Sequence, residues 1–173
     1  MNMIQGLESD SLAENSEGNQ YLTFLLAGEE YGVDILRVQE IKGWDNVTMI
    51  PNTPDYIKGV INLRGTIVPI VDLRARFSLE TIPYGITTVV IVLRVNSDNG
   101  SRIMGIVVDA VSEVYNISEE ALKQAPDFGQ AISTDFVMGL GTVDDKMIIV
   151  LDIDHLLNSS VLKAIADQGE KSA

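Results

Sequence analysis

The chain contains no cysteine and only one histidine among its 173 residues. Without cysteine there are no disulfides, no thiolate metal sites and no cysteine nucleophile, and a lone histidine removes most histidine chemistry. No apolar run approaches the roughly 18 residues of a membrane span, and the N-terminus lacks the basic and apolar regions of a secretory signal. We therefore expect a cytoplasmic protein with no direct membrane insertion.

Basic residues are also scarce. The sequence has 12 Lys and Arg against 25 Asp and Glu, which gives a formal net charge of −13. This acidity opposes binding to nucleic acid, which needs clustered cations to neutralise phosphates, and it equally opposes docking on anionic membranes. It permits selective contact with proteins that offer cationic or apolar patches. An apolar content of 46% is ample for the core of one domain or of two small, closely joined ones.

Two segments of the sequence occur twice, in the same order. Tyr31 to Ile41 aligns without a gap on Met104 to Val114, and Asp55 to Leu73 aligns without a gap on Asp135 to Ile153. Two such matches in one order favour a duplicated module, which predicts two similar halves. The aligned pairs include Gly32 with Gly105, Val38 with Val111, Glu40 with Glu113, Gly59 with Gly139 and Asp72 with Asp152.

Short β-rich runs separated by turn residues dominate both halves, and helical patterns are few. About ten short strands in two similar sets predict a mainly β fold, built as two small barrels that pack on each other because each alone is too small for a strong core. The predicted divisions are a flexible acidic N-terminal tail (1–19), a domain (20–158) of two duplicated β subdomains (about 20–80 and 86–158), and a C-terminal helix and tail (159–173).

Signals of enzymatic chemistry are weak. The glycines of residues 59–65 fit neither common phosphate-binding pattern, and no nucleophile-elbow motif is present. Asp152 and Asp154 could face one cation, but the glycine and the terminal glutamate of a calcium loop are missing. The alternative is a small hydrolase or metal-dependent enzyme that uses Asp152, Asp154 and His155. His155 is better explained as a surface or capping residue at the start of a helix. We expect no enzymatic activity and no cofactor.

The copies differ most clearly at a predicted hairpin tip, where Arg64-Gly65 in the first copy corresponds to Asp144-Asp145 in the second. Gly65 supplies the positive φ that a tight hairpin requires. Arg64 would then display a planar guanidinium with five donors on a rigid support. A solvated turn arginine without a binding role explains the pattern equally well. The sole tryptophan, Trp44, is expected to pack on the barrel wall or to anchor an interface.

Several stretches of the chain resemble one protein family. They are YGVDILRVQEI from Tyr31, IPNTPDYIKGVINLRGTIVPIVDLR from Ile50 to Arg74, GIVVDAVSEV from Gly105 to Val114, and the terminal IVLDIDHLLN. In this order they resemble the bacterial chemotaxis coupling proteins of the CheW family. The resemblance runs from about Tyr21 to Asn158. It is specific, because GVINLRG followed by VPIVDLR at fixed spacing is a long signature.

The resemblance implies a non-catalytic adaptor made of two SH3-like five-stranded β-barrel subdomains with short helices. Such adaptors couple the cytoplasmic tips of methyl-accepting chemoreceptors to the regulatory domain of the histidine kinase CheA. They also help to assemble receptor arrays at the membrane. Within such arrays, the adaptor could associate with copies of itself or form rings. A further alternative is an adaptor of the same fold that serves a different receptor–kinase pathway, such as surface motility, because partner choice depends on a few surface residues.

The same resemblance implies two contact surfaces. The receptor surface is associated with the groove between the barrels and would comprise Glu40, Lys58, Gly59, Arg64 and Gly65. The kinase surface is an apolar face of the first barrel and would comprise Leu22, Ile35, Val38 and Ile50.

Overall fold

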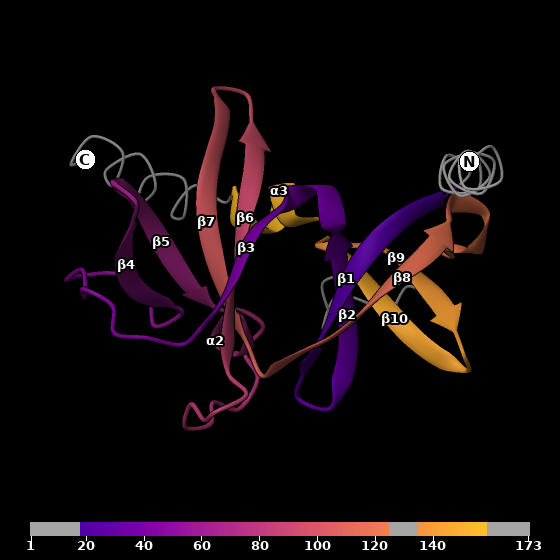
Figure 1. Cartoon of the computed structure of the whole chain (residues 1–173), viewed down its shortest axis with the longest axis horizontal. Coiled ribbons are helices and arrows are strands. Elements are labelled where there is room, and N and C mark those ends of the chain that lie inside the picture. Colours follow the sequence, from indigo (N-terminus) through magenta and orange to yellow (C-terminus); the bar gives the residue numbers. More distant parts are fainter. Residues whose placement is uncertain (1–17, 125–134, 159–173) are drawn as a thin grey trace, which may run out of the picture.

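The computed structural model describes residues 18–124 and 135–158, which form two five-stranded sheets lying side by side (Figure 1). Sheet A has the strand order β8-β1-β2-β10-β9, and sheet B has the order β3-β6-β7-β5-β4. The strands are β1 (Gly18–Leu26), β2 (Glu29–Asp34), β3 (Val38–Gly43), β4 (Ile57–Leu63), β5 (Thr66–Asp72), β6 (Val89–Ser97), β7 (Gly100–Val108), β8 (Ala110–Ser118), β9 (Val137–Val143) and β10 (Lys146–Leu151). The short helices are η1 (Ile35–Arg37), α2 (Leu73–Arg76), η2 (Glu119–Ala121) and α3 (Ile153–Leu157).

The ends of the described chain refine two predicted boundaries. β1 pairs Gly18 with Ser118, so Gly18 and Asn19 belong to sheet A rather than to the predicted tail 1–19. Residues 1–17 and 159–173, which carry the rest of that tail and the predicted C-terminal helix, lie outside the described residues.

Each sheet takes strands from both halves of the sequence. The chain leaves sheet A after β2, builds β3 to β7 in sheet B, and returns to sheet A for β8 to β10. Parallel pairing of β2 with β10, and of β5 with β7, joins the two halves within each sheet. The predicted subdomains 20–80 and 86–158 are therefore wrong as structural units, because each half contributes its first hairpin to the sheet of the other half.

The duplication itself is visible in details that recur in both sheets. Replacing each strand by its counterpart in the other copy converts the strand order of sheet A into that of sheet B. Asp72 and Asp152 each cap the helix that follows, accepting a hydrogen bond from the backbone N–H of the third residue on. Each copy also has the same backbone bridge, formed by Thr48 with Val60 and by Lys123 with Leu140.

The apolar core has three parts. A central cluster between the sheets takes side chains from both, and each sheet has a smaller cluster of its own. β6 serves two of them: Ile91 and Leu93 belong to the central cluster, while Val90 and Val92 belong to the cluster of sheet B. Successive side chains of a strand face opposite sides, so a strand buried on both faces is apolar almost throughout, as VVIVLRV is.

Two ion pairs hold the places where the chain crosses between the sheets. After β2, Arg37 of η1 donates from Nη1 and Nη2 to the two carboxylate oxygens of Asp154 of α3, at 2.8 Å each. Between β7 and β8, Asp109 accepts from Nε and Nη2 of Arg74 of α2, at 2.8 and 2.6 Å. Two parallel charge-assisted bonds fix the orientation of both partners, so each crossing is pinned to a helix.

Both aspartates are held in their ionised form. For Asp109, the hydrogen bond from Arg74 outweighs burial, and the backbone N–H of Ala27 adds to it, so the pKa lies below its ordinary value. For Asp154, burial opposes ionisation, but the hydrogen bond from Arg37 and one from a backbone N–H of β6 outweigh it. The pKa of Asp154 is therefore lowered as well.

These shifts predict stability that is lost in acid. Because the folded-state pKa is lowered, the stabilisation is complete above the ordinary aspartate pKa of about 4 and disappears as pH falls through the lowered pKa. Arg74→Gln should lower the free energy of unfolding at neutral pH and flatten its dependence on pH below about 4, by up to about 1.4 kcal/mol per pH unit. Urea titrations at a series of pH values measure both effects. Arg94→Gln, on an exposed position of β6, is the control, and an equally flat profile for it would contradict the assignment.

Gly59 occupies a position that only glycine fits. Its φ is +141°, and a Cβ there would lie 2.3 Å from the backbone oxygen of Thr48, in the bridge to β4. Gly59→Ala should therefore lower the free energy of unfolding by about 3 kcal/mol. Gly43→Ala, where a Cβ meets nothing within 4 Å, should change it by less than about 0.5 kcal/mol. Equal effects of the two changes in urea unfolding would show that the bridge does not need this close approach.

Candidate functional site

The tip of the β4–β5 hairpin is a two-residue turn with a fixed shape. Arg64 and Gly65 have positive φ angles of 52° and 91°, as the tightest hairpin turns require. The backbone N–H of Gly65 donates to Oδ1 of Asn62 at 2.8 Å, which ties the turn to its own strand. The sequence reasoning missed Asn62, although Asn at the start of a turn is a recognised signal for such a bond.

Arg64 reaches from this tip to the edge strand β3. Its Nη2 donates to Oε1 of Glu40 at 2.8 Å, while 73% of the Arg64 side chain stays exposed. An exposed pair of this kind contributes roughly 0–1 kcal/mol to stability, since water screens the attraction. The pair therefore positions the guanidinium more than it stabilises the fold, and a planar group with five donors can bind a partner and Glu40 together.

A groove of about 180 Å³ follows the open seam between β3 and β4, the two edge strands of sheet B. β3 lines it through Lys42 and Gly43, and β4 lines it through residues 60–62. Thr48 and Val60 close the seam at one point with two backbone hydrogen bonds of 2.9 and 2.8 Å. This groove belongs to sheet B alone, whereas the resemblance associated the receptor contact with the space between the barrels.

Lys58 and Gly59, also predicted at the receptor surface, have packing roles of their own. The ammonium of Lys58 lies 5.7 Å from the ring centroid of Tyr84, and that ring packs edge-on against Trp44 with centroids 4.4 Å apart. The Tyr84 hydroxyl donates to Asp72, and burial together with this bond raises the pKa of Tyr84 well above its ordinary value. Gly59 is required by the backbone bridge. Trp44 thus takes the packing role, the first of its two expected roles.

Leu22, predicted at the kinase surface, is a core residue. Its side chain is 4% exposed and belongs to the central cluster, together with Phe24 of the same strand. Tyr21 and Thr23, on the opposite face of β1, are buried as well. The prediction of Leu22 as a surface contact is therefore wrong, because β1 has no solvent face along this stretch.

The other predicted kinase residues lie between core and surface. Ile35, Val38 and Ile50 are half-buried and pack against the central cluster. Their sequence neighbours Leu36 and Met49 are 73% and 81% exposed. The sequence reasoning missed these two residues. The signal that could have found them is a large apolar residue at a solvent-facing position of a short irregular segment.

The residues of the metal-dependent alternative have structural roles. Asp152 accepts the backbone N–H of His155 at 3.1 Å as the cap of α3, and Asp154 pairs with Arg37. The His155 ring packs on Phe136 with centroids 5.4 Å apart. Across residues 18–124 and 135–158, no group of His, Cys, Asp and Glu is arranged to hold a metal ion.

The fold and the site together define a protein-interaction module. Two small sheets share one core, and sheet B presents a positioned arginine beside an open seam. In the described part of the chain, no helix has the length and apolar character needed to cross a bilayer.

The chain belongs to the CheW family, since the family model for the CheW-like domain matches residues 20–161. It is 48% identical over 161 residues to the chemotaxis protein CheW of Klebsiella aerogenes, a match that covers 93% of this chain and 94% of that protein. The chemotaxis protein CheW of Rhizobium meliloti is 33% identical over 147 residues, covering 85% and 92%. A crystal structure of the scaffolding protein TtCheW from Thermoanaerobacter tengcongensis matches with a TM-score of 0.74 at 36% identity, covering 83% of this chain and 94% of that one.

These similarities confirm the resemblance and the mainly β fold with two SH3-like subdomains. The two subdomains correspond to sheets A and B, and not to the two halves of the sequence. The similarities also give the chain an adaptor and scaffold role in chemotaxis.

Proposed function

We propose that the chain couples the cytoplasmic tips of chemoreceptors to the regulatory domain of the histidine kinase CheA, and that it is recruited in this way to receptor arrays at the membrane. The observation that supports this most is the geometry of Arg64: a rigid turn holds it, Glu40 orients it, and most of its side chain is exposed. The chain has a net charge of −13, so the exposed positive charge of Arg64 is a distinct local feature that a partner can recognise.

The receptor contact is centred on the hairpin tip and the seam of sheet B. The guanidinium of Arg64 can donate in a directional way to carboxylates, and to the backbone carbonyls that are left unpaired where a receptor helix ends in a turn. The adjacent groove, whose lining is mainly polar, gives a concave surface in which the polar side chains of a helix can lie. In this proposal Glu40, Arg64 and Gly65 make the contact, and Lys58 and Gly59 shape the strand that carries it.

The kinase contact uses apolar side chains of η1, β3 and the connection between β3 and β4. Ile35, Val38 and Ile50 lie at the margin of the central core, and Leu36 and Met49 extend this apolar character into solvent. Each contact is modest in area, so stable arrays require many of them, including self-association of the adaptor.

Reversing the charge of Arg64 should weaken receptor binding and leave the fold intact. Arg64→Glu removes the guanidinium and places two carboxylates against each other, so the Kd for a receptor signalling fragment should rise about tenfold or more. The free energy of unfolding should change by less than about 1 kcal/mol. Arg94→Glu makes the same charge change on β6 and should leave the Kd unaltered. Loss of kinase-domain binding to the same extent as receptor binding would contradict the assignment of Arg64.

The kinase contact makes a separate prediction. Leu36→Glu and Met49→Glu should each weaken binding to the kinase regulatory domain about tenfold, because a charge would be buried in an apolar interface. Both variants should unfold at the same urea concentration as the parent. Ile86→Glu, at a fully exposed apolar position in the β5–β6 connection, is the matched control. Kinase binding is measured by calorimetry. Unchanged binding by both variants would show that the kinase contacts a different surface of the protein.

A further inference from the structure

Sheet A has a seam equivalent to that of sheet B, with different chemistry. Its edge strands are β8 and β9, and the equivalent backbone bridge joins Lys123, in the segment after β8, to Leu140 of β9. Glu113 of β8 occupies the position that Glu40 occupies in β3. The β9–β10 tip, however, carries Asp144 and Asp145 with φ angles of 52° and 65°, where the β4–β5 tip carries an arginine and a glycine. Sheet A therefore has acidic residues at both of the positions that form the ion pair of sheet B.

Tyr115 shows that these acidic groups converge. A hydrogen bond with Glu113 raises the pKa of the Tyr115 hydroxyl to about 12, with further contributions from burial and from the charges of Glu113, Glu30 and Asp144. The three carboxylates come from β8, from β2 and from the hairpin tip. Segments far apart in the sequence thus place their negative charge around one hydroxyl at the seam of sheet A.

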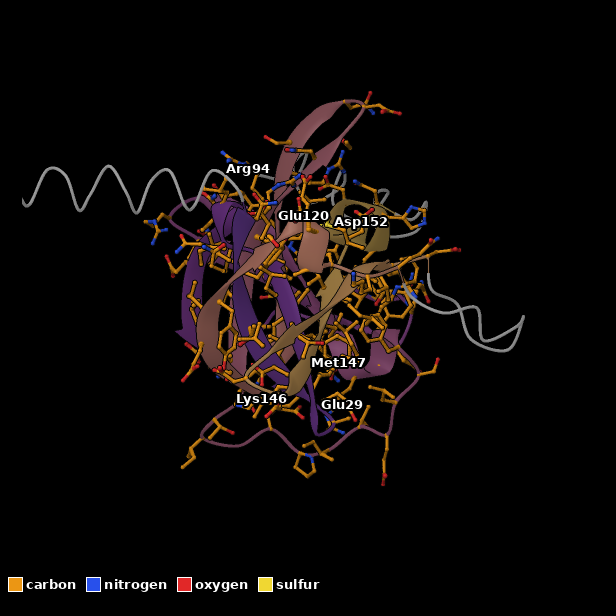
Figure 2. The ribbon with its side chains drawn as sticks, turned by 90° about the vertical axis from the view of Figure 1, so that its right-hand side faces the viewer. Glu29, Arg94, Glu120, Lys146, Met147 and Asp152 are labelled. Atoms are coloured by element: carbon orange, nitrogen blue, oxygen red, sulfur yellow. The ribbon has the colours of Figure 1, made fainter. Side chains whose placement is uncertain are left out.

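Glu30 gives an independent sign that this region receives a donor. Its side chain is only 9% exposed, and its Oε2 is buried without a hydrogen-bond partner. Lys146 Nζ forms an ion pair with the other oxygen, Oε1, at 4.0 Å, a distance too long for a hydrogen bond, and this contact leaves Oε2 without a donor. Figure 2 shows Lys146 and Glu29, the residue before Glu30, at one end of sheet A, away from Asp152. A buried carboxylate oxygen of this kind normally has a donor, and leaving it without one costs about 1–3 kcal/mol.

We propose that this acidic seam, formed by Glu30, Glu113, Tyr115, Asp144 and Asp145, binds the guanidinium of an arginine that a partner protein presents. In sheet B the equivalent position is filled from within the chain, by Arg64. A planar group with five donors can serve several carboxylates at once, which a single ammonium does less well. The net charge of −13 draws a basic segment toward the chain, and the seam selects where its arginine docks.

The site can be filled deliberately by copying the tip of sheet B. The double variant Asp144→Arg with Asp145→Gly would place an arginine of the chain against Glu113, and glycine suits the positive φ at position 145. We expect this variant to be at least as resistant to heat as the parent. Its seam should no longer accept an arginine from outside.

Binding is measured by NMR, from the shifts of backbone amides in the parent chain titrated with the blocked peptide Gly-Arg-Gly at constant ionic strength. We expect saturable shifts at residues 113–115 and 144–146, an affinity about threefold lower in Glu113→Gln, and no saturable shift in the double variant. The blocked peptide Gly-Gln-Gly should give none.

Three outcomes of the peptide titrations would overturn the proposal. They are the absence of saturable shifts in the parent, equal shifts with Gly-Gln-Gly, and arginine binding retained by a folded double variant. Shifts produced by Mg²⁺ alone, with none from the arginine peptide, would also overturn it and identify the seam as a cation site.

Discussion

The two crossings between the sheets are the constraint on which the rest of the structure depends. Because the chain crosses after β2 and again after β7, each half of the sequence places its first hairpin in the sheet of the other half. The central core then forms only when both halves are present. Arg37 with Asp154 and Arg74 with Asp109 pin the crossings in similar ways, with acid and base exchanged between helix and crossing segment. The first crossing also sets where β3 begins, and hence where Glu40 meets the hairpin tip.

The sequence contained enough information for the duplication, the strands and the hairpin tip, and too little for the pairing of halves. The gapless matches around Gly59 and Gly139 reflect a backbone arrangement that both copies share, in which each glycine lies close to the backbone oxygen of the bridging residue, Thr48 or Lys123. The alternation of apolar and polar residues along a strand shows which face of the strand is buried, but it does not show which other strand lies beside it. The alternation is therefore the same whether a hairpin joins the sheet of its own half or that of the other half. The predicted boundary at about residues 80–86 therefore separated strands that belong together.

The candidate site was predictable in part for similar reasons. Arg64 beside Gly65 is a local signal, since turn chemistry acts over a few residues. Its partner Glu40 and the groove along the seam depend on long-range packing, which no local pattern reports. Leu22 was misplaced because β1 is buried on both faces, so its alternation does not identify a solvent side. The two copies have kept the groups that hold the backbone, such as the helix-capping Asp72 and Asp152, and have diverged where side chains reach solvent.

We propose that this scaffold transmits receptor state to a kinase through the tip and seam of sheet B. The most direct test is a reconstitution of receptor signalling fragments on vesicles with the kinase, in which phosphorylation is measured with and without this protein. The account predicts that kinase activity comes under receptor control when the parent protein is added, and that it fails to do so with a folded Arg64→Glu variant. Receptor-controlled phosphorylation that is the same with the parent, with the variant and with neither would contradict it.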